Sequence, residues 1–171
     1  MAFLVFEGID GAGKSTLMNS LKEELIKKNQ EVVVTREPGG TALGEELRQI
    51  LLKKEGDTPV PRTELLLYEA IRAQHVERVL KPAIEQEKWI LCDRFTASTL
   101  AFQAGGRQLD RGPIDWLNSY ATDGIAPNLF ILLDLEPNVG QKRMLGREKD
   151  RFELENSDFH HRVRNFYLKL A

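Results

Sequence analysis

The chain has 171 residues, enough for one domain with a substantial core, and we expect a single domain over residues 1–171. Its formal net charge of -2 argues against a general nucleic-acid binder, and its one cysteine, Cys92, excludes an internal disulfide. No apolar run approaches the roughly 18 residues needed to cross a bilayer, so we expect a cytoplasmic protein without nucleic-acid or membrane partners.

The first elements along the chain are a strand, a glycine-rich loop and a helix. Phe3-Leu4-Val5-Phe6 predicts a short buried strand, and apolar residues at helical spacing predict a helix from Thr16 to Lys28. Between them the chain matches the phosphate-binding P-loop pattern G-x-x-x-x-G-K-[ST] at Gly8, Ile9, Asp10, Gly11, Ala12, Gly13, Lys14 and Ser15. Glycines let successive N–H groups point at phosphate oxygens, Lys14 can reach the β and γ phosphates, and the Ser15 hydroxyl can ligate Mg²⁺. We therefore predict a nucleotide-binding loop here.

A second buried strand is predicted over residues 31–35, which contain Val32-Val33-Val34. Two such strands joined by a helix form a βαβ unit and hence a parallel sheet. The strand runs into the turn Arg36-Glu37-Pro38-Gly39-Gly40, at the end of the strand where open parallel sheets bind ligands. We expect Arg36 near bound phosphate, with a solvated arginine on a surface turn as the alternative.

Two predicted helices come next. Helical spacing of apolar residues predicts them over about residues 42–53 and 62–87. Arg48 lies near the middle of the first, and Pro82 should kink or interrupt the second. Tyr68 and Arg72 are four residues apart and share a helical face, so the pair could stack on and hydrogen-bond to a nucleotide base. A core tyrosine beside a surface arginine is the alternative.

The third strand is Trp89-Ile90-Leu91-Cys92, and Asp93 and Arg94 follow it directly. An acid after an apolar strand resembles a Walker B element, whose carboxylate lies beside the P-loop magnesium ion. Asp93 therefore joins Ser15 as a candidate Mg²⁺ ligand, although a helix-capping aspartate would give the same pattern. A short helix over residues 96–104, ending at Gly105-Gly106-Arg107, and another helix after Gly112 are predicted next.

The fourth strand covers residues 129–133, and a helix begins at about Val139. That helix gives way to a charged stretch, Gly146 to Arg151, which has no apolar face. A solvated loop is the simplest interpretation, but arginines on a mobile segment are also what phosphoryl transfer would use. We therefore predict a lid segment at about residues 143–153, followed by a last helix over residues 157–170.

Several of these motifs, taken together, point to a family. They are Phe6 to Thr16, Thr35 to Thr41, Asp93-Arg94-Phe95 with Ser98-Thr99, and Asp150-Arg151-Phe152-Glu153. Through them the sequence resembles bacterial thymidylate kinases over nearly its whole length. We predict an α/β fold of the P-loop type, with a parallel sheet in the strand order 2-3-1-4. The resemblance implies transfer of the ATP γ-phosphoryl group to dTMP, which gives dTDP and ADP.

The resemblance also implies roles for single residues. It implies that Lys14, Ser15 and Thr16 hold the ATP phosphates and Mg²⁺, and that Asp10 is oriented toward the acceptor nucleotide. Tyr68 matches a residue that stacks on thymine, Arg72 and Thr99 match groups that read the base edge, and Phe102 crowds the sugar 2′ position. The peptide bond Glu37-Pro38 matches one that is cis in the family. The predicted dTMP-binding residues are Asp10, Arg36, Pro38, Arg48, Tyr68, Arg72, Arg94, Ser98, Thr99, Phe102 and Gln103.

The source of the additional catalytic cation is a further expectation. Some thymidylate kinases carry an arginine inside the P-loop, at the position that Gly11 occupies here. The cation should then come from the lid, from Arg147 or Arg151, with Arg147 favoured because Gly146 beside it allows reach. The predicted catalytic residues are Asp10, Lys14, Arg94, Arg147 and Arg151.

Other expectations follow from the family as well. The family continues into a fifth strand and a helix beyond the position of Ala171, so the adenine contacts are left undefined here. The family also implies a homodimer. A kinase for another nucleoside monophosphate or for a deoxynucleoside is the alternative enzyme. A GTPase-like switch is a different class, but the sequence lacks the N-K-x-D guanine signature.

Overall fold

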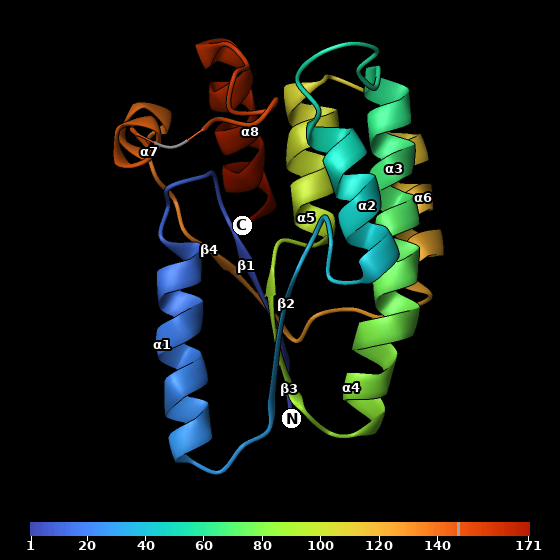
Figure 1. The fold of residues 1–171 in the computed structure, drawn as a ribbon, viewed down its shortest axis with the longest axis vertical. Helices are drawn as coiled ribbons and strands as arrows, with labels where there is room; N and C mark the ends of the chain where they lie inside the picture. Colours follow the sequence, from blue (N-terminus) through green and yellow to red (C-terminus); the bar gives the residue numbers. More distant parts are fainter. Residues whose placement is uncertain (147) are drawn as a thin grey trace.

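The computed structural model describes residues 1–146 and 148–171, and its centre is a four-stranded sheet (Figure 1). The strands are β1 (Phe3–Glu7), β2 (Val32–Arg36), β3 (Trp89–Asp93) and β4 (Leu129–Leu132). Within the described residues their order is β2-β3-β1-β4, and each neighbouring pair is parallel. The predicted α/β fold and the predicted strand order are both confirmed.

The register of the sheet brings the carboxyl ends of three strands together. Phe6 near the end of β1 lies opposite Asp93 of β3, and Arg36 at the end of β2 lies opposite the same Asp93. The segments that leave these strands therefore begin side by side at one edge of the sheet. This edge is where the candidate site is built.

Helices cover both faces of the sheet. They are α1 (Lys14–Lys27), α2 (Ala42–Leu52), α3 (Pro61–His75), the π-helix η1 (Val76–Leu80), α4 (Lys81–Glu85), α5 (Thr96–Thr99), the π-helix η2 (Leu100–Gly106), α6 (Arg111–Thr122), α7 (Pro137–Arg143) and α8 (Ser157–Leu170). Phe6 and Leu91 pack against α1, whereas Phe3 and Ile90 belong to the core under η1 and α4. Side chains that alternate along a strand thus fill two separate layers of core. Among the described residues, the search for a helix with the length and apolarity of a membrane span found none.

The predicted long helix over residues 62–87 is three elements, and its irregular turn lies before Pro82 rather than at it. The chain runs as α3 to His75, as η1 over Val76–Leu80, and as α4, which has Pro82 in its first turn. Proline has no N–H to donate to the preceding turn, and a π-helical turn just before it reroutes the backbone hydrogen bonds. The predicted interruption is therefore present, but it is spread over the five residues of η1.

The short helix predicted to end at Gly105-Gly106-Arg107 does end there, but it consists of α5 followed by the π-helix η2, whose last residue is Gly106. Both glycines lie against α8: a Cβ on Gly105 would approach Phe166 Cβ to 2.8 Å, and one on Gly106 would approach Phe159 Cε2 to 2.5 Å. The two glycines therefore also permit close packing of η2 against α8. The remaining boundaries agree with the predictions to within about two residues, and α8 spans Ser157–Leu170 as expected.

Candidate active site

The P-loop joins β1 to α1, and its backbone takes the shape that the glycines were predicted to allow. Gly8, Gly11 and Gly13 have φ angles of 130°, 79° and 99°. A Cβ on Gly8 would lie 2.3 Å from the carbonyl oxygen of Leu133, so that position also requires glycine for space. The loop leads directly into the first turn of α1, where free N–H groups and the helix dipole favour an anion.

Lys14 is folded back over this loop. Its Nζ donates to the carbonyl oxygens of Gly8 and Ile9, each at 3.1 Å, and lies 3.9 Å from carboxylate oxygens of Asp10 and Asp93. Burial lowers the pKa of Lys14 to about 8, although both carboxylates act in the opposite direction. A phosphate group would therefore meet a desolvated amine that is already aimed into the loop.

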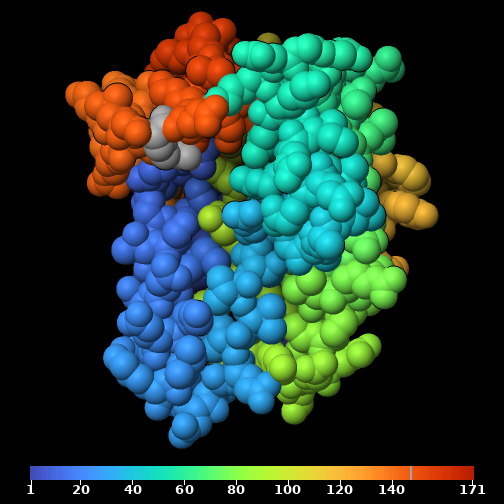
Figure 2. All heavy atoms as spheres, in the orientation of Figure 1, coloured from blue at the N-terminus to red at the C-terminus, as the bar shows by residue number. Residues whose placement is uncertain are grey.

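Beside the P-loop lies a cavity of about 150 Å³ that contains the predicted acceptor residues. In Figure 2 the surface is hollowed where the blue, cyan and orange parts of the chain meet. The lining residues are Asp10, Arg36, Glu37, Pro38, Arg48, Leu52, Tyr68, Arg72, Asp93, Arg94, Phe95, Ser98, Thr99, Phe102, Asp150 and Phe152. Of the predicted dTMP-binding residues, only Gln103 is not in this lining. Its side chain is completely buried and donates to Glu64 at 2.7 Å.

Arg94 is the most constrained of the cavity arginines. Its backbone φ is +74°, an uncommon conformation for a residue with a side chain. The guanidinium donates to Asp10 Oδ1 at 2.9 Å and to the Tyr167 hydroxyl at 3.0 Å, and lies 5.1 Å from the centre of the Phe102 ring. Because fixed partners hold three sides of the group, its direction is set before any ligand arrives.

The buried carboxylate of Glu7 holds the loop that carries Arg94, and the sequence prediction missed it. It accepts hydrogen bonds from Phe95 N at 2.9 Å, from Ser98 Oγ at 2.6 Å and from the Tyr167 hydroxyl at 2.9 Å. Burial raises the pKa of Glu7, and these donors act to lower it. The available signal was an acid placed between a buried strand and the first P-loop glycine.

Two further cavity arginines, Arg36 and Arg48, have fewer fixed partners than Arg94. Arg36 pairs with the half-exposed carboxylate of Glu45 at 2.8 Å. Arg48 donates to the carbonyl oxygen of Pro38 at 2.7 Å, and the Glu37-Pro38 peptide is cis, as the resemblance implied. Both guanidinium groups border the same cavity as Arg94.

Arg72 is buried, so the alternative of a surface arginine is wrong. Only 1% of it is exposed, and it donates to Glu37 and Glu69 at 2.8 Å each and to Asn118 at 2.5 Å. Two carboxylates thus neutralise its charge, and the remaining edge of the guanidinium borders the cavity. Such a group suits a neutral acceptor such as a base carbonyl better than a second phosphate.

The candidate metal ligands also lie near the P-loop. Ser15, in the first turn of α1, and Asp93 line a second cavity of about 400 Å³. Asp93 Oδ1 is buried and has no hydrogen-bond partner within the described part of the chain, so it retains acceptor capacity. The described residues hold no cluster of three or more His, Cys, Asp or Glu suited to a metal. Mg²⁺ needs only one or two protein oxygens when phosphates and water complete its shell, so this pair fits that ion.

Of the two predicted lid arginines, the structure describes only Arg151. Arg147 lies outside the described residues. Arg151 is bound to α2, to α3 and to the loop between them. Its guanidinium donates to Glu64 at 2.9 Å and to the carbonyl oxygens of Leu51 at 3.1 Å and Pro59 at 3.3 Å. A residue that the prediction missed, Arg143 at the end of α7, donates to the P-loop carbonyl of Gly11 at 3.1 Å.

Comparisons with known proteins give one consistent result. The family described as thymidylate kinase matches residues 6–171. The chain is 49% identical to a thymidylate kinase of Bdellovibrio bacteriovorus, over 99% of this chain and 82% of the relative, and 49% identical to one of Geotalea daltonii, over 99% and 83%. A crystal structure of thymidylate kinase from Ehrlichia chaffeensis superposes with a TM-score of 0.81 at 35% identity, covering 99% of this chain and 80% of that one.

Proposed function

The chain belongs to the thymidylate kinase family, and from that premise we propose how its residues transfer the γ-phosphoryl group of ATP to dTMP, giving dTDP and ADP. One observation carries the proposal: residues from five separate stretches of the chain, assigned to dTMP by the resemblance, line a single cavity beside the P-loop. Little covalent work falls to a protein in phosphoryl transfer. Positioning and charge neutralisation are therefore the tasks of this site.

The acceptor phosphate binds among Arg36, Arg48 and Arg94. An oxygen of that phosphate attacks the γ-phosphorus, and the bond from this phosphorus to the oxygen bridging it to ADP breaks as ADP leaves. Arg94 is aimed into the cavity by Asp10 and Tyr167, so its contact with the phosphate needs no reorganisation. Asp10 belongs to the P-loop and therefore links the acceptor side to the donor side.

The thymine base binds deeper in the cavity. Tyr68 stacks on the ring, and Arg72, neutralised by Glu37 and Glu69, donates to the base edge together with Thr99. Phe102 lies beside the sugar and disfavours a 2′-hydroxyl. Gln103 contributes indirectly, because its amide donates a hydrogen bond to Glu64. Ser98 also contributes indirectly. Its hydroxyl donates a hydrogen bond to the carboxylate of Glu7, which holds the loop that carries Arg94.

ATP binds to residues 8–16, with its phosphates against the P-loop backbone and Lys14. Ser15 and Asp93 would hold Mg²⁺, whose charge when bound offsets that of the β and γ phosphates. For Lys14 to bind a phosphate, its hydrogen bonds to Gly8 and Ile9 must be exchanged for bonds to phosphate oxygens. The lid at about residues 143–153 excludes water, which would otherwise compete as the acceptor.

We propose a homodimer in the cytoplasm, as the family resemblance implies. The supporting observation is a pair of exposed, stacked aromatic rings on α6, Trp116 and Tyr120, with centroids 5.6 Å apart and exposed fractions of 64% and 74%. Large exposed aromatic surfaces are typical of contact sites. Light scattering on the purified protein, with Trp116→Glu as the disrupting variant, measures whether the mass is that of two chains.

The function is tested with a panel of acceptors and ATP as the donor. We expect kcat/KM to be highest for dTMP among nucleoside monophosphates, with thymidine itself a poor acceptor because it lacks the phosphate that the three arginines bind. A clear preference for another monophosphate or for a deoxynucleoside would contradict the proposal. Tight nucleotide retention without turnover on dTMP would favour the switch-like alternative.

A further inference from the structure

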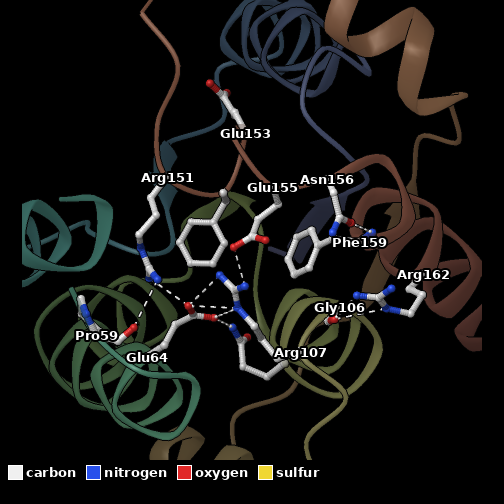
Figure 3. Close-up of polar contacts among 12 residues, drawn as sticks. Pro59, Glu64, Gly106, Arg107, Arg151, Glu153, Glu155, Asn156, Phe159 and Arg162 are labelled. Carbon is white, nitrogen blue, oxygen red and sulfur yellow. Dashed lines mark hydrogen bonds and ion pairs between the residues drawn. The ribbon is translucent and has the colours of Figure 1, made fainter. Parts of the chain in front are cut away.

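A partly buried ion cluster fixes the carboxyl end of the lid to α2, α3 and the loop between them (Figure 3). We define the anchor cluster as the side chains of Glu64, Gln103, Arg107, Arg151 and Glu155. Its centre is Glu64 in the first turn of α3, which is completely buried. Arg107 Nε donates to both oxygens of Glu64 at 3.1 and 3.2 Å, and Arg151 Nη2 donates to one of them at 2.9 Å. A second carboxylate, Glu155, accepts from Arg107 at 2.5 Å, so the cluster pairs two arginines with two acids.

Arg151 uses all three of its nitrogens in this arrangement. Besides Glu64, it binds the carbonyl oxygens of Leu51 at the end of α2 and of Pro59 in the loop before α3. One side chain therefore joins segment 150–155 to α2, to α3 and to the loop between them. Arginine is suited to this because its fork of donors is rigid and always charged.

The turn that carries Arg151 is itself fixed. Asp150 Oδ1 accepts from the backbone N–H groups of Phe152 at 2.9 Å and Glu153 at 3.0 Å, and Glu153 Oε2 accepts from Asp150 N at 3.1 Å. This is the reciprocal arrangement of a capping box. In the motif Asp150-Arg151-Phe152-Glu153, the two acids therefore lock the turn while the residues between them point to partners elsewhere.

Phe152 is the part of this turn that reaches the acceptor site. It is buried to all but 4% and lines the dTMP cavity. Its ring centre lies 6.1 Å from that of Tyr68 and 6.0 Å from that of Phe102. The guanidinium carbons of Arg107 and Arg151 lie 5.5 and 4.8 Å from the same ring. Both arginines of the anchor cluster thus contact the residue that closes the cavity wall.

We propose that Glu64 is a positioning residue for dTMP: by holding Arg107 and Arg151, it keeps Phe152 in the wall against which the nucleotide packs. The inference rests on the proposed dTMP site. It assigns Arg151 to the anchor cluster and not to the γ-phosphate. The carboxyl end of the lid, from Asp150 onward, is therefore fixed to the rest of the molecule. Removing the charge of Glu64 would leave two partly buried guanidinium groups without their shared counter-charge.

The variant Glu64→Gln removes the charge and preserves the shape. We expect the KM for dTMP to rise by roughly tenfold or more while the KM for ATP stays within about twofold, because only the acceptor wall is disturbed. The matched control is Glu24→Gln, the same change at an exposed, ion-paired glutamate on α1, and its KM for dTMP should equal that of the unmodified protein. An unchanged KM for dTMP in Glu64→Gln overturns the inference, whereas absent dTMP turnover in the unmodified protein overturns the proposed function instead.

A double-variant cycle tests whether Glu64 acts through Phe152. Phe152→Leu alone should raise the KM for dTMP, and adding Glu64→Gln should raise it by no more than about twofold further, since the affected contact is already lost. Independent effects that multiply would overturn the inference. If Glu64→Gln does not fold, Arg151→Lys replaces it, because lysine keeps the charge and loses the fork. A raised KM for dTMP in that variant supports the anchor, and a loss of kcat with an unchanged KM overturns it in favour of a γ-phosphate role.

Discussion

The donor side and the acceptor side of this site are built in different ways. The donor side consists of consecutive residues, 8 to 16, whose backbone N–H groups follow from one strand-loop-helix unit. The acceptor side gathers side chains from six segments, and buried carboxylates hold them in place, among them Glu7, Glu37 and Glu64, which are 1%, 4% and 0% exposed. Glu7 holds the loop that carries Arg94, Glu37 binds Arg72, and Glu64 binds Arg107 and Arg151. The donor site is thus made by local backbone geometry, and the acceptor site by long-range charge pairing.

This contrast predicts where substitutions act. Changes to cations that meet the transferring group should lower kcat, because that charge develops in the transition state. Changes to the held arginines of the acceptor side should raise the KM for dTMP. The following predictions test that division, starting with the largest expected effect.

Arg147→Ala should reduce kcat by about 10³-fold or more while the affinity for dTMP stays nearly unchanged, as expected for a cation that stabilises the transferring phosphoryl group. Gly146, which precedes it, has a φ of +90° and so permits an abrupt change of chain direction. Steady-state kinetics and dTMP titration measure the two quantities. Lys142→Ala, at an exposed site on α7, is the control, and wild-type turnover in Arg147→Ala would move the assignment to Arg143 or to an acceptor-side arginine.

Arg94→Ala should lower kcat/KM for dTMP by about 10²–10³-fold, the range for removing a charge-assisted phosphate contact together with the hydrogen-bonded ion pair to Asp10. The KM for ATP should change little. Varying each substrate in turn separates the effects, and equal losses for both substrates would contradict an acceptor-side role.

Phe102→Ala should relax the preference for dTMP over its ribonucleotide counterpart by about 1–3 kcal/mol, the range for a small group in an apolar pocket. Its ring packs edge-on against Phe152, Phe159 and Tyr167, so the wall is held on several sides. The ratio of the two kcat/KM values is the measurement, with Phe102→Leu as the milder control. A constant ratio would make Phe102 a core residue only.

The last prediction concerns pH. Burial lowers the pKa of Lys14 to about 8, so kcat/KM for ATP should fall by about tenfold per pH unit above pH 8 as the free enzyme loses this charge. Bound phosphates favour the charged amine, so kcat at saturating ATP should stay flat over the same range and serves as the internal control. Between pH 8 and about 10.5, Lys14 is protonated in the unfolded chain but mostly neutral in the folded protein. Its titration therefore makes the free energy of unfolding rise with pH over this range. A kcat/KM profile that is level to pH 10 would contradict the assignment.

The sequence was sufficient for those parts of the molecule that depend on local pattern. The P-loop, the four strands and α8 follow from motif, apolar runs and helical spacing, whereas the strand order was predicted together with the family resemblance. The sequence was less informative about the two π-helical segments: Pro82 predicted an interruption but not that η1 would precede it, and the close packing of Gly105 and Gly106 on α8 was not predicted. Nothing in the local pattern near these residues specifies such contacts.

The same limit applies to the acceptor site. The resemblance assigned residues to dTMP, but it did not indicate that Glu7, Glu37 and Glu64 would hold them. Their partners are 35 to 160 positions away in the chain, as for Arg72 with Glu37 and Tyr167 with Glu7. Arg151 is an example. Its charged sequence context predicted a mobile cation, whereas in the structure Arg151 donates a hydrogen bond to Glu64.

A structure of the protein in complex with dTMP tests the central claim most directly. The account predicts the phosphate against Arg36, Arg48 and Arg94, the thymine ring over Tyr68 with its edge at Arg72, and Phe152 in contact with the nucleotide. A nucleotide bound outside this cavity, or one whose phosphate lies at Arg72 and whose base lies at Arg94, would contradict it.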